Sequence, residues 1–114
     1  MPNVVTPVTY RGTRGTGGAC TVVVIGRDGS VTPLRRRLEL RNHSPDGFEW
    51  GYGGSGPAQL ALALLADVLD DNRRALRLYQ DFKWAHIANL PRDAPWQFTD
   101  DMIRGFADEV ERDA

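Results

Sequence analysis

The glycine-rich segment of residues 51–56, Gly-Tyr-Gly-Gly-Ser-Gly, has the composition of a backbone site for an anion. It follows an alternating segment typical of a strand, residues 48–50, and precedes a long apolar run typical of a helix. Unpaired N–H groups at the start of a helix, together with the helix dipole, favour a negatively charged ligand. The sequence therefore predicts an anion nest formed by Gly53, Gly54, Ser55 and Gly56. The alternative is a tight strand-to-helix turn whose glycines let another segment approach closely.

The same segment matches the G-x-G-x-x-G string of dinucleotide-binding folds, but the sequence that follows does not fit such a fold. That fold needs a second parallel strand with an acidic residue for the ribose, and here a second helical pattern comes next. A phosphate-binding loop of an ATPase is excluded because no Lys-Ser or Lys-Thr pair ends the glycine run. We therefore predict neither a dinucleotide-binding fold nor a phosphate-loop ATPase.

Ser55 stands at the strand-turn-helix junction, where the serine nucleophile of a G-x-S-x-G motif would stand. Pro57 replaces the last glycine of that motif, and the chain is much shorter than an α/β-hydrolase. His43 with Asp46 or Glu49 nominally completes a catalytic triad, but such trios occur in most proteins. A role in capping the helix or in forming the turn is sufficient for Ser55. We therefore predict no catalytic residue, and we favour a protein that is not an enzyme.

Metal-binding residues are scarce, because the chain has two histidines and one cysteine. His86 shares a helical face with Tyr79 and Phe82, which favours a hydrogen-bonded core histidine over a metal ligand. His43 is interpreted as a turn residue, and the single cysteine, Cys20, excludes an internal disulfide. We predict neither a metal ion nor any other cofactor.

Trp84 is unusual because it lies on the charged face of its predicted helix, with Arg74, Arg77 and Asp81. Two interpretations stay open: Trp84 packs under the N-terminal segment, or it marks an interface with a protein partner, where aromatic residues are enriched. Trp96 is more simply explained as an anchor that fixes a proline-containing loop to the core.

The charge is unevenly distributed along the chain. Residues 1–45 carry seven basic and two acidic side chains, whereas residues 46–114 carry seven basic and thirteen acidic side chains. This asymmetry favours attraction between a basic sheet and an acidic helical layer over a basic surface for a partner. The formal net charge of -1 and the absence of a known reader motif argue against binding to nucleic acid.

Strand patterns dominate the first half of the chain and predict an antiparallel sheet of three to four strands. The predicted strands are residues 4–10, 20–25, 34–41 and 48–50. The Asp-Gly pair at residues 28–29 predicts a hairpin, and residues 11–18, with four glycines, predict a loop. Within residues 34–41 the leucines alternate with Arg35, Arg37 and Arg41, so a leucine face should meet the helices and an arginine face should meet water.

Helical patterns fill the second half. An apolar run from about residue 56 or 57 to residue 70 predicts a central helix that must be buried, because it lacks a broad polar face. Its moderately polar stripe consists of Gln59, Ala63, Ala66, Asp67 and Asp70. Residues 73–89 and a segment that Thr99 should cap predict two further amphipathic helices, separated by a loop over residues 90–98. Leu62 and Leu65 are predicted core residues.

These patterns together predict an α+β fold in which a small antiparallel sheet packs on a central buried helix. The length of 114 residues predicts one domain over residues 1–114. The apolar run is too short to cross a bilayer, and the first residues lack the pattern of a signal peptide. We therefore expect a soluble, cytoplasmic protein that does not bind membranes.

Residues 43–63 have the sequence HSPDGFEWGYGGSGPAQLALA. This sequence resembles the signature of a family of small uncharacterised proteins, a domain of unknown function scattered through bacteria, archaea, phages and plasmids. The similarity extends over nearly the whole chain. It implies no reaction, cofactor or catalytic residue, and the distribution implies an association with mobile elements.

The sequence therefore predicts a non-catalytic binding or interaction module. Its ligand would be an anionic small molecule or nucleotide at residues 51–56, or a protein that contacts Trp84. The alternative is a small enzyme, or a nucleotide- or anion-binding protein, that uses the glycine turn at residues 51–56.

Overall fold

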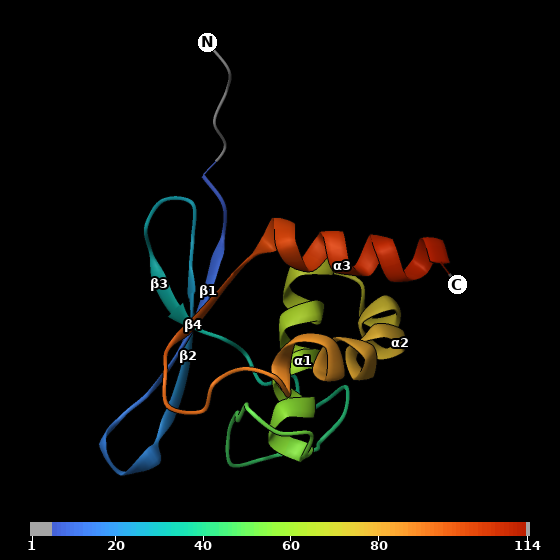
Figure 1. Ribbon diagram of the computed structural model, residues 1–114. Coiled ribbons are helices and arrows are strands. Elements are labelled where there is room, and N and C mark those ends of the chain that lie inside the picture. The colour runs from blue at the N-terminus through green and yellow to red at the C-terminus, as the bar shows by residue number, and fades with distance from the viewer. Residues whose placement is uncertain (1–5, 114) are drawn as a thin grey trace.

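The computed structural model describes residues 6–113 as a four-stranded antiparallel sheet with three helices on one side of it (Figure 1). The strands are β1 (Thr9–Arg14), β2 (Cys20–Ile25), β3 (Val31–Pro33) and β4 (Trp96–Thr99), in the spatial order β3-β2-β1-β4. The helices are α1 (Ser55–Leu69), α2 (Asn72–Phe82) and α3 (Asp100–Asp113), and a π-helical turn, η2 (Lys83–Ile87), continues α2. The predicted α+β class is confirmed.

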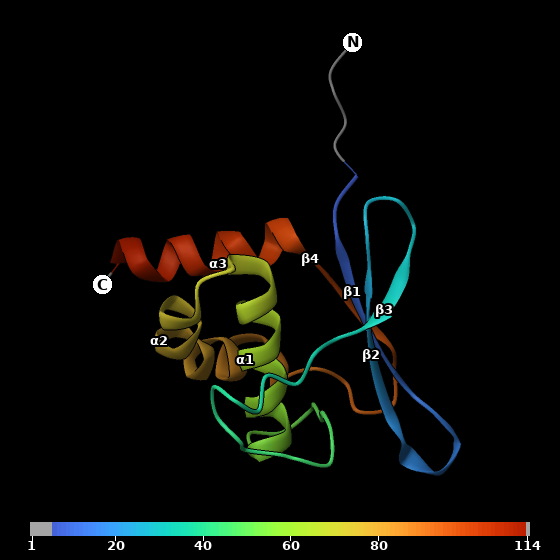
Figure 2. The ribbon, with the colours of Figure 1, turned by 180° about the vertical axis from the view of Figure 1, so that it is seen from behind.

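Helix α1 is the centre of the structure, as predicted. It lies between the sheet and α2, and α3 crosses over its upper end in the view of Figure 1; the reverse view in Figure 2 agrees. Residues 56–66 are all buried, and Leu62 and Leu65 are fully enclosed, which confirms their place in the core. Burial of a helix on all sides is what its continuous run of alanine and leucine requires.

The predicted polar stripe of α1 is wrong in part, because Gln59, Ala63 and Ala66 are buried. The Gln59 side chain is satisfied by backbone groups of the long segment that connects β3 to α1. Its oxygen accepts hydrogen bonds from the backbone N–H groups of His43 (2.8 Å) and Ser44 (3.2 Å), and its amide donates to the carbonyl of Arg36 (2.7 Å). Gln59 therefore fixes this connection to the helix, since a buried amide must find partners.

The predicted strand over residues 34–41 is also wrong, because the chain leaves the sheet after Pro33. The backbone N–H of Leu34 makes a last hydrogen bond to the carbonyl of Val22 (3.0 Å), and the Leu34 side chain is buried. The following residues form turns in which Arg37 has a positive φ of 59°. No flat arginine face results: Arg37 donates to Glu39 and Asn72, and Arg35 and Arg41 are exposed.

The fourth strand lies in a different segment from the one predicted. Residues 48–50 form no strand, although Phe48 and Trp50 are buried. Strand β4 instead falls in the segment that was predicted to be a loop, and it pairs with β1. The predicted loop over residues 11–18 is wrong in its first half, which belongs to β1. Gly12 fits inside this strand because the indole of its cross-strand partner Trp96 occupies the space of a side chain.

The remaining element boundaries follow local chemistry. The hairpin at residues 27–30 is confirmed, with Gly29 at a φ of +85° between β2 and β3. The predicted cap of the third helix is confirmed as well, because Thr99 Oγ1 accepts a hydrogen bond from the N–H of Met102 (3.2 Å). The strand predicted over residues 4–10 falls partly on residues 1–5, which lie outside the described residues; β1 begins at Thr9.

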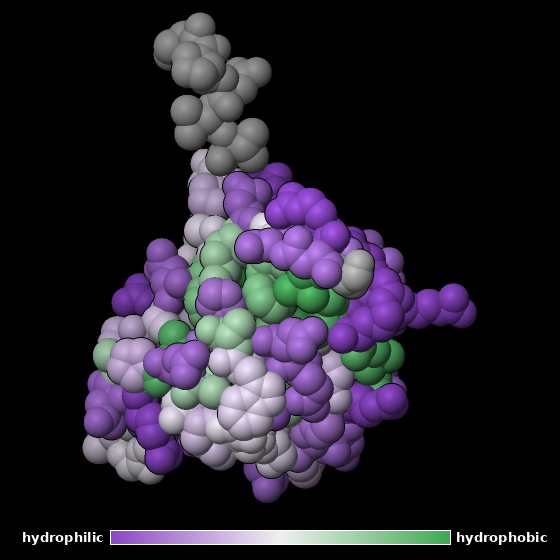
Figure 3. Space-filling view, turned by 45° about the vertical axis from the view of Figure 1, so that its right-hand side comes forward, coloured by the Kyte–Doolittle hydropathy of each residue, from purple (hydrophilic) through white to green (hydrophobic). Residues whose placement is uncertain are grey.

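The helical side of the molecule carries partly buried apolar side chains, which pack around the core. They are Leu69, Leu76, Met102, Phe106 and Val110. Figure 3 shows a strip of apolar side chains on this side, bordered by hydrophilic ones. Between residues 6 and 113, no helix combines the length and the apolar character that a membrane span requires.

Candidate functional site

The glycine turn, residues 51–56, leads directly into α1. Gly54 is the residue that precedes the first turn, and its backbone is extended, with a φ of −101° and a ψ of −164°. No side chain caps the helix, so the predicted capping role of Ser55 is wrong: Ser55 is the first residue of α1 and is exposed. Among residues 6–113, no hydrogen bond uses the N–H groups of Gly53, Gly54, Ser55 or Gly56. The amides that the predicted anion nest requires are therefore without acceptors.

Side chains cover the places where the glycines lack a Cβ atom. A methyl group on Gly53 would collide with the ring of Trp84, and one on Gly54 would collide with the ring of Tyr52. A methyl group on Gly56 would lie 2.6 Å from the Cβ atom of Glu49. The close approach of other side chains thus explains why glycine occupies these positions. The anion nest stays a prediction, because a side chain that covers the Cβ position does not block the direction in which the backbone N–H group points.

Trp84 and the glycine turn were separate candidates in the sequence, and the structure brings them together. The Trp84 side chain rests on Gly53 although 57% of the residue is exposed, and Tyr52, which rests on Gly54, is 42% exposed. With Val31 on β3, these are the exposed large hydrophobic residues of the described chain. We call the group of Tyr52, Gly53, Gly54 and Trp84 the aromatic surface.

Two cations flank the aromatic surface. Lys83 Nζ lies 4.4 Å from the ring centroid of Trp84, and the guanidinium carbon of Arg92 lies 5.5 Å from that of Tyr52. Both distances are within the range of cation–π attraction. Sequence reasoning missed Lys83, although one signal was present: it is the only lysine among the 14 basic residues of the chain.

An ion pair joins β1 to the segments that flank the aromatic surface. Arg14 on β1 forms two parallel hydrogen bonds to Glu49, Nη1 to Oε2 (3.0 Å) and Nη2 to Oε1 (2.8 Å). Its Nε donates to the carbonyl of Arg92 (2.8 Å), and its guanidinium lies 5.0 Å from the ring centroid of the buried Trp50. The hydrogen bonds from Arg14 lower the pKa of Glu49 to about 2. The carboxylate is therefore fully ionised and already neutralised within the protein.

The catalytic residues considered in the sequence are not assembled. Glu49 is engaged by Arg14, and His43 Nε2 lies 2.8 Å from the hydroxyl of Tyr79. No hydrogen bond of the described residues joins Ser55 to either of them or to Asp46. The exposed Ser55 hydroxyl therefore has no general base beside it, which a serine nucleophile requires.

His86 sits among aromatic rings. Its ring centroid lies 5.2 Å from that of Phe82, 5.4 Å from that of Phe106 and 6.2 Å from that of Phe98. Burial lowers the pKa of His86, so the imidazole is neutral near pH 7. The predicted core position is only partly met, because His86 is half-buried against these rings. No hydrogen bond of the described residues reaches the ring, so the predicted hydrogen bonding is not seen.

Cys20 lies beside two hollows of about 280 and about 210 Å³. The hollows share Cys20, Asp46, Gly47 and Phe48, and no residue of the glycine turn lines either of them. Burial raises the pKa of the Cys20 thiol, which keeps it protonated and weakly reactive. Within residues 6–113, no three His, Cys, Asp or Glu side chains are grouped closely enough to hold a metal ion.

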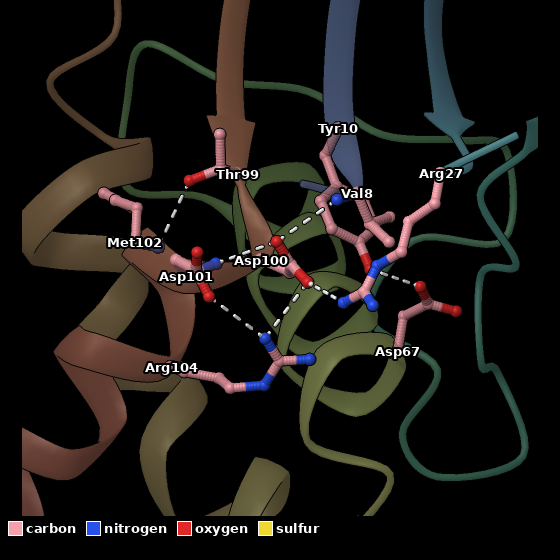
Figure 4. A network of polar contacts seen from close by, with 9 residues as sticks. All are labelled: Val8, Tyr10, Arg27, Asp67, Thr99, Asp100, Asp101, Met102 and Arg104. Atoms are coloured by element: carbon pink, nitrogen blue, oxygen red, sulfur yellow. Dashed lines mark hydrogen bonds and ion pairs between the residues drawn. The ribbon is translucent and has the colours of Figure 1, made fainter. Parts of the chain in front are cut away.

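A second polar cluster lies at the start of α3 and centres on Asp100, whose side chain is 2% exposed (Figure 4). One carboxylate oxygen accepts hydrogen bonds from the N–H groups of Val8 (3.2 Å) and Asp101 (3.0 Å). The other accepts from Arg27 (3.1 Å) and Arg104 (3.0 Å). Burial opposes ionisation, but the two arginines outweigh it and lower the pKa of Asp100. The cluster fastens the start of β1 to β4 and α3.

Tyr10 extends this polar cluster toward α1. Its hydroxyl donates a hydrogen bond of 2.5 Å to Asp67, as the close-up in Figure 4 shows. Burial of the phenol and the neighbouring carboxylate both raise the pKa of Tyr10, so the side chain stays protonated. The contact joins β1 to the helix that lies under the sheet.

Comparison with known proteins gives one match. Residues 10–109 match the model of a family of unknown function (DUF6166), and this range includes residues 43–63. No curated protein matches the chain, and no solved structure matches it.

Proposed function

The chain belongs to the family of unknown function DUF6166, and from this premise we propose that it is a non-catalytic binding module that holds a protein partner on the aromatic surface. Membership confirms the resemblance seen in the sequence. The family itself names no activity. The proposal therefore rests on one observation: the exposed rings of Trp84 and Tyr52 are both fixed against the same glycine turn.

Fixed aromatic side chains are suited to binding. Tryptophan and tyrosine dominate the residues that contribute most to protein–protein affinity, because each buries a large apolar area while losing few rotatable bonds. Here the contacts with Gly53 and Gly54 restrict the rings before a partner arrives. Restriction in the free protein lowers the entropy lost on association. The aromatic surface therefore has both the composition and the pre-organisation of a contact site.

The charges around the rings favour an acidic peptide segment as the partner. Lys83 and Arg92 lie over the two rings, and within residues 6–113 neither forms an ion pair with a carboxylate. The positive end of the α1 dipole lies at the same place. Complementary charge speeds encounter and suppresses wrong partners. A small apolar ligand is less well supported, since the two hollows lie beside β2 and not at the turn.

Selection of random phage-displayed peptides against the parent protein tests the proposal. We expect the selected peptides to be rich in aspartate and glutamate. Trp84→Ala should weaken the binding of a selected, fluorescently labelled peptide by about thirtyfold, which corresponds to about 2 kcal/mol. Fluorescence anisotropy measures the affinity. Val31→Ala is the matched control, because Val31 is 61% exposed but belongs to β3, outside the aromatic surface.

Two results contradict the proposal. One is a selected peptide that binds the Trp84→Ala variant as tightly as it binds the parent. The other is a parent protein that sediments as a dimer which Trp84→Ala converts to a monomer, since the occupant would then be a second copy of the chain. An association with phages or plasmids, which the resemblance implied, stays a prediction, because neither the contacts nor the family match bears on it.

A further inference from the structure

Two neighbouring hollows lie between β2 and the connection of residues 34–54, which leads from β3 to α1. The reverse view in Figure 2 shows this connection crossing from the sheet to α1. The hollows measure about 280 and about 210 Å³, and Cys20, Asp46, Gly47 and Phe48 line both of them. Because they share these residues, one small molecule can reach into both. Sites for small molecules usually measure about 300–1,000 Å³, so the two hollows together have room for a metabolite.

The wall that the connection provides is fixed before any ligand binds. Gln59 of α1 accepts hydrogen bonds from the backbone N–H groups of His43 and Ser44. The Ser44 hydroxyl donates to the carbonyl of Gly47 (2.8 Å), whose positive φ of 141° suits glycine. The next residue, Phe48, is buried in the core. A wall that is already ordered lowers the entropy lost on binding.

The core contributes apolar side chains to the smaller hollow. Val22, Leu34 and Phe48 line it, and all three belong to the buried core. Pro33, the last residue of β3, lines it as well. A ligand with an apolar portion would remove that portion from water here, which favours binding.

Two side chains of opposite charge line the same smaller hollow without pairing with each other. Arg36 and Asp46 are both exposed, and within residues 6–113 neither forms an ion pair. They nevertheless lie close together, because Arg36 Nη1 donates a hydrogen bond to the carbonyl of Pro45 (2.6 Å), the residue before Asp46. No other acceptor among the described residues contacts this guanidinium. The hollow therefore offers a cation and an anion, each able to bind a group of opposite charge.

The larger hollow adds no further unpaired charge. Asp46 and Glu49 are the charged residues that line it, and Arg14 holds both carboxylate oxygens of Glu49. The charged groups that a ligand could use are therefore Asp46, which borders both hollows, and Arg36.

We propose that the two hollows bind a free amino acid with an apolar side chain. Its ammonium group pairs with Asp46, its carboxylate accepts hydrogen bonds from Arg36, and its side chain lies against Phe48. A zwitterion satisfies both protein charges at once, whereas a simple amine or a simple carboxylic acid satisfies only one. No residue of the aromatic surface lines either hollow, so this site is additional to the proposed function.

Isothermal titration calorimetry with L-leucine, L-methionine and L-phenylalanine tests the site. At least one of them should bind in a saturable manner. For the amino acid that binds most tightly, two analogues separate the charges: the amine that lacks its carboxylate and the acid that lacks its amino group. Each analogue should bind about tenfold more weakly or worse, the effect of a lost charged hydrogen bond.

Variants then assign each charge to its partner. Asp46→Asn should weaken binding of the amino acid by about tenfold but should not weaken binding of the acid analogue. Arg36→Gln should likewise weaken binding of the amino acid but not binding of the amine. Arg35→Gln is the matched control, because Arg35 is exposed and lines neither hollow.

Alkylation of Cys20 by iodoacetamide gives a second measurement on the parent protein. The chain has one cysteine, so the reaction reports on this site alone. At alkaline pH, where the thiolate forms, the bound amino acid should slow the alkylation. The absence of saturable binding for all three amino acids would overturn the proposal. Binding that neither slows alkylation nor responds to Asp46→Asn and Arg36→Gln would overturn it too, since the amino acid would then lie elsewhere.

Discussion

The N-termini of α3 and α1 meet the same electrostatic requirement in opposite ways. Each exposes a positive helix end, which favours negative charge. Helix α3 provides that charge itself, because Asp100 and Asp101 lie in its first turn, and two arginines neutralise the buried Asp100 in turn. Helix α1 has no acidic residue in its first turn, and the ring of Trp84, which carries Lys83 above it, covers Gly53 just before the helix. The N-terminus of α3 therefore has a negative group within the protein, whereas the first turn of α1 lacks one.

This difference separates a structural role from a binding role. The Asp100 cluster gives each of its charges a partner, so its groups fix β1, β4 and α3 and have nothing left to offer a ligand. At the α1 N-terminus the exposed rings, the unpaired amides and the two cations are all available. Groups that lower the stability of a protein are typical of functional sites, because their function keeps them in the sequence.

The largest effect on stability should come from removing the Asp100 carboxylate at the N-terminus of α3. Asp100→Ala leaves two arginines and two backbone N–H groups without their acceptor, and we expect a loss of about 3 kcal/mol in the free energy of unfolding. Urea unfolding measures it. Asp101→Ala is the control: its carboxylate is 86% exposed, so the loss should stay within about 0.5 kcal/mol. Equal losses in the two variants would contradict the comparison.

The second largest effect on stability should come from lowering the pH. The pKa of Glu49 falls from 4.5 to about 2 on folding, so its ion pair with Arg14 stabilises the protein above pH 4.5 and is lost as the pH falls toward 2. The side chain is 30% exposed, and solvent screening limits the effect to about 1–2 kcal/mol. Thermal unfolding across this pH range measures it. Glu49→Gln should be less stable at pH 7 and should show a shallower acid dependence; an unchanged slope would contradict the assignment.

The smallest effect should come from a substitution beside the aromatic surface. Lys83→Met should change the free energy of unfolding by no more than about 0.5 kcal/mol, because methionine keeps the aliphatic packing and Lys83 forms no ion pair within residues 6–113. The same type of substitution near the N-terminus of α3, Arg104→Met, should lower stability, since Arg104 pairs with Asp100. Urea unfolding of both variants gives the comparison. Destabilisation by Lys83→Met would show that the lysine has a structural partner.

The sequence was sufficient for the elements that a local pattern determines. The apolar run of α1, the Asp-Gly hairpin and the Thr99 cap each follow from residues close together in the chain, and all three are confirmed. The errors occur where distant residues decide the structure. Residues 34–41 alternate like a strand, but Gln59 holds this connection against α1 instead. Residues 96–99 form a strand because β1 offers an edge with Gly12 beneath Trp96.

The candidate site shows the same limit. Sequence reasoning found the glycine turn and Trp84, but not that they are one surface, since their contact depends on how η2 packs beside α1. Lys83 was not singled out, because its place over the Trp84 ring is a property of the fold and not of the sequence pattern. A search for residue types that occur once in the chain would have drawn attention to this lysine.

The pairing of β1 with β4 has a consequence for synthesis on the ribosome. Thr9 pairs with Thr99, so this edge of the sheet cannot close until residues 96–99 have emerged. Until then β1 presents one unpaired edge, and the apolar surface of α1 lacks part of its cover. The hairpin of β2 and β3 and the pair of α1 and α2 are built from local contacts and can form earlier. A nascent chain that stalls before residue 96 should therefore be a preferred target for chaperones and proteases.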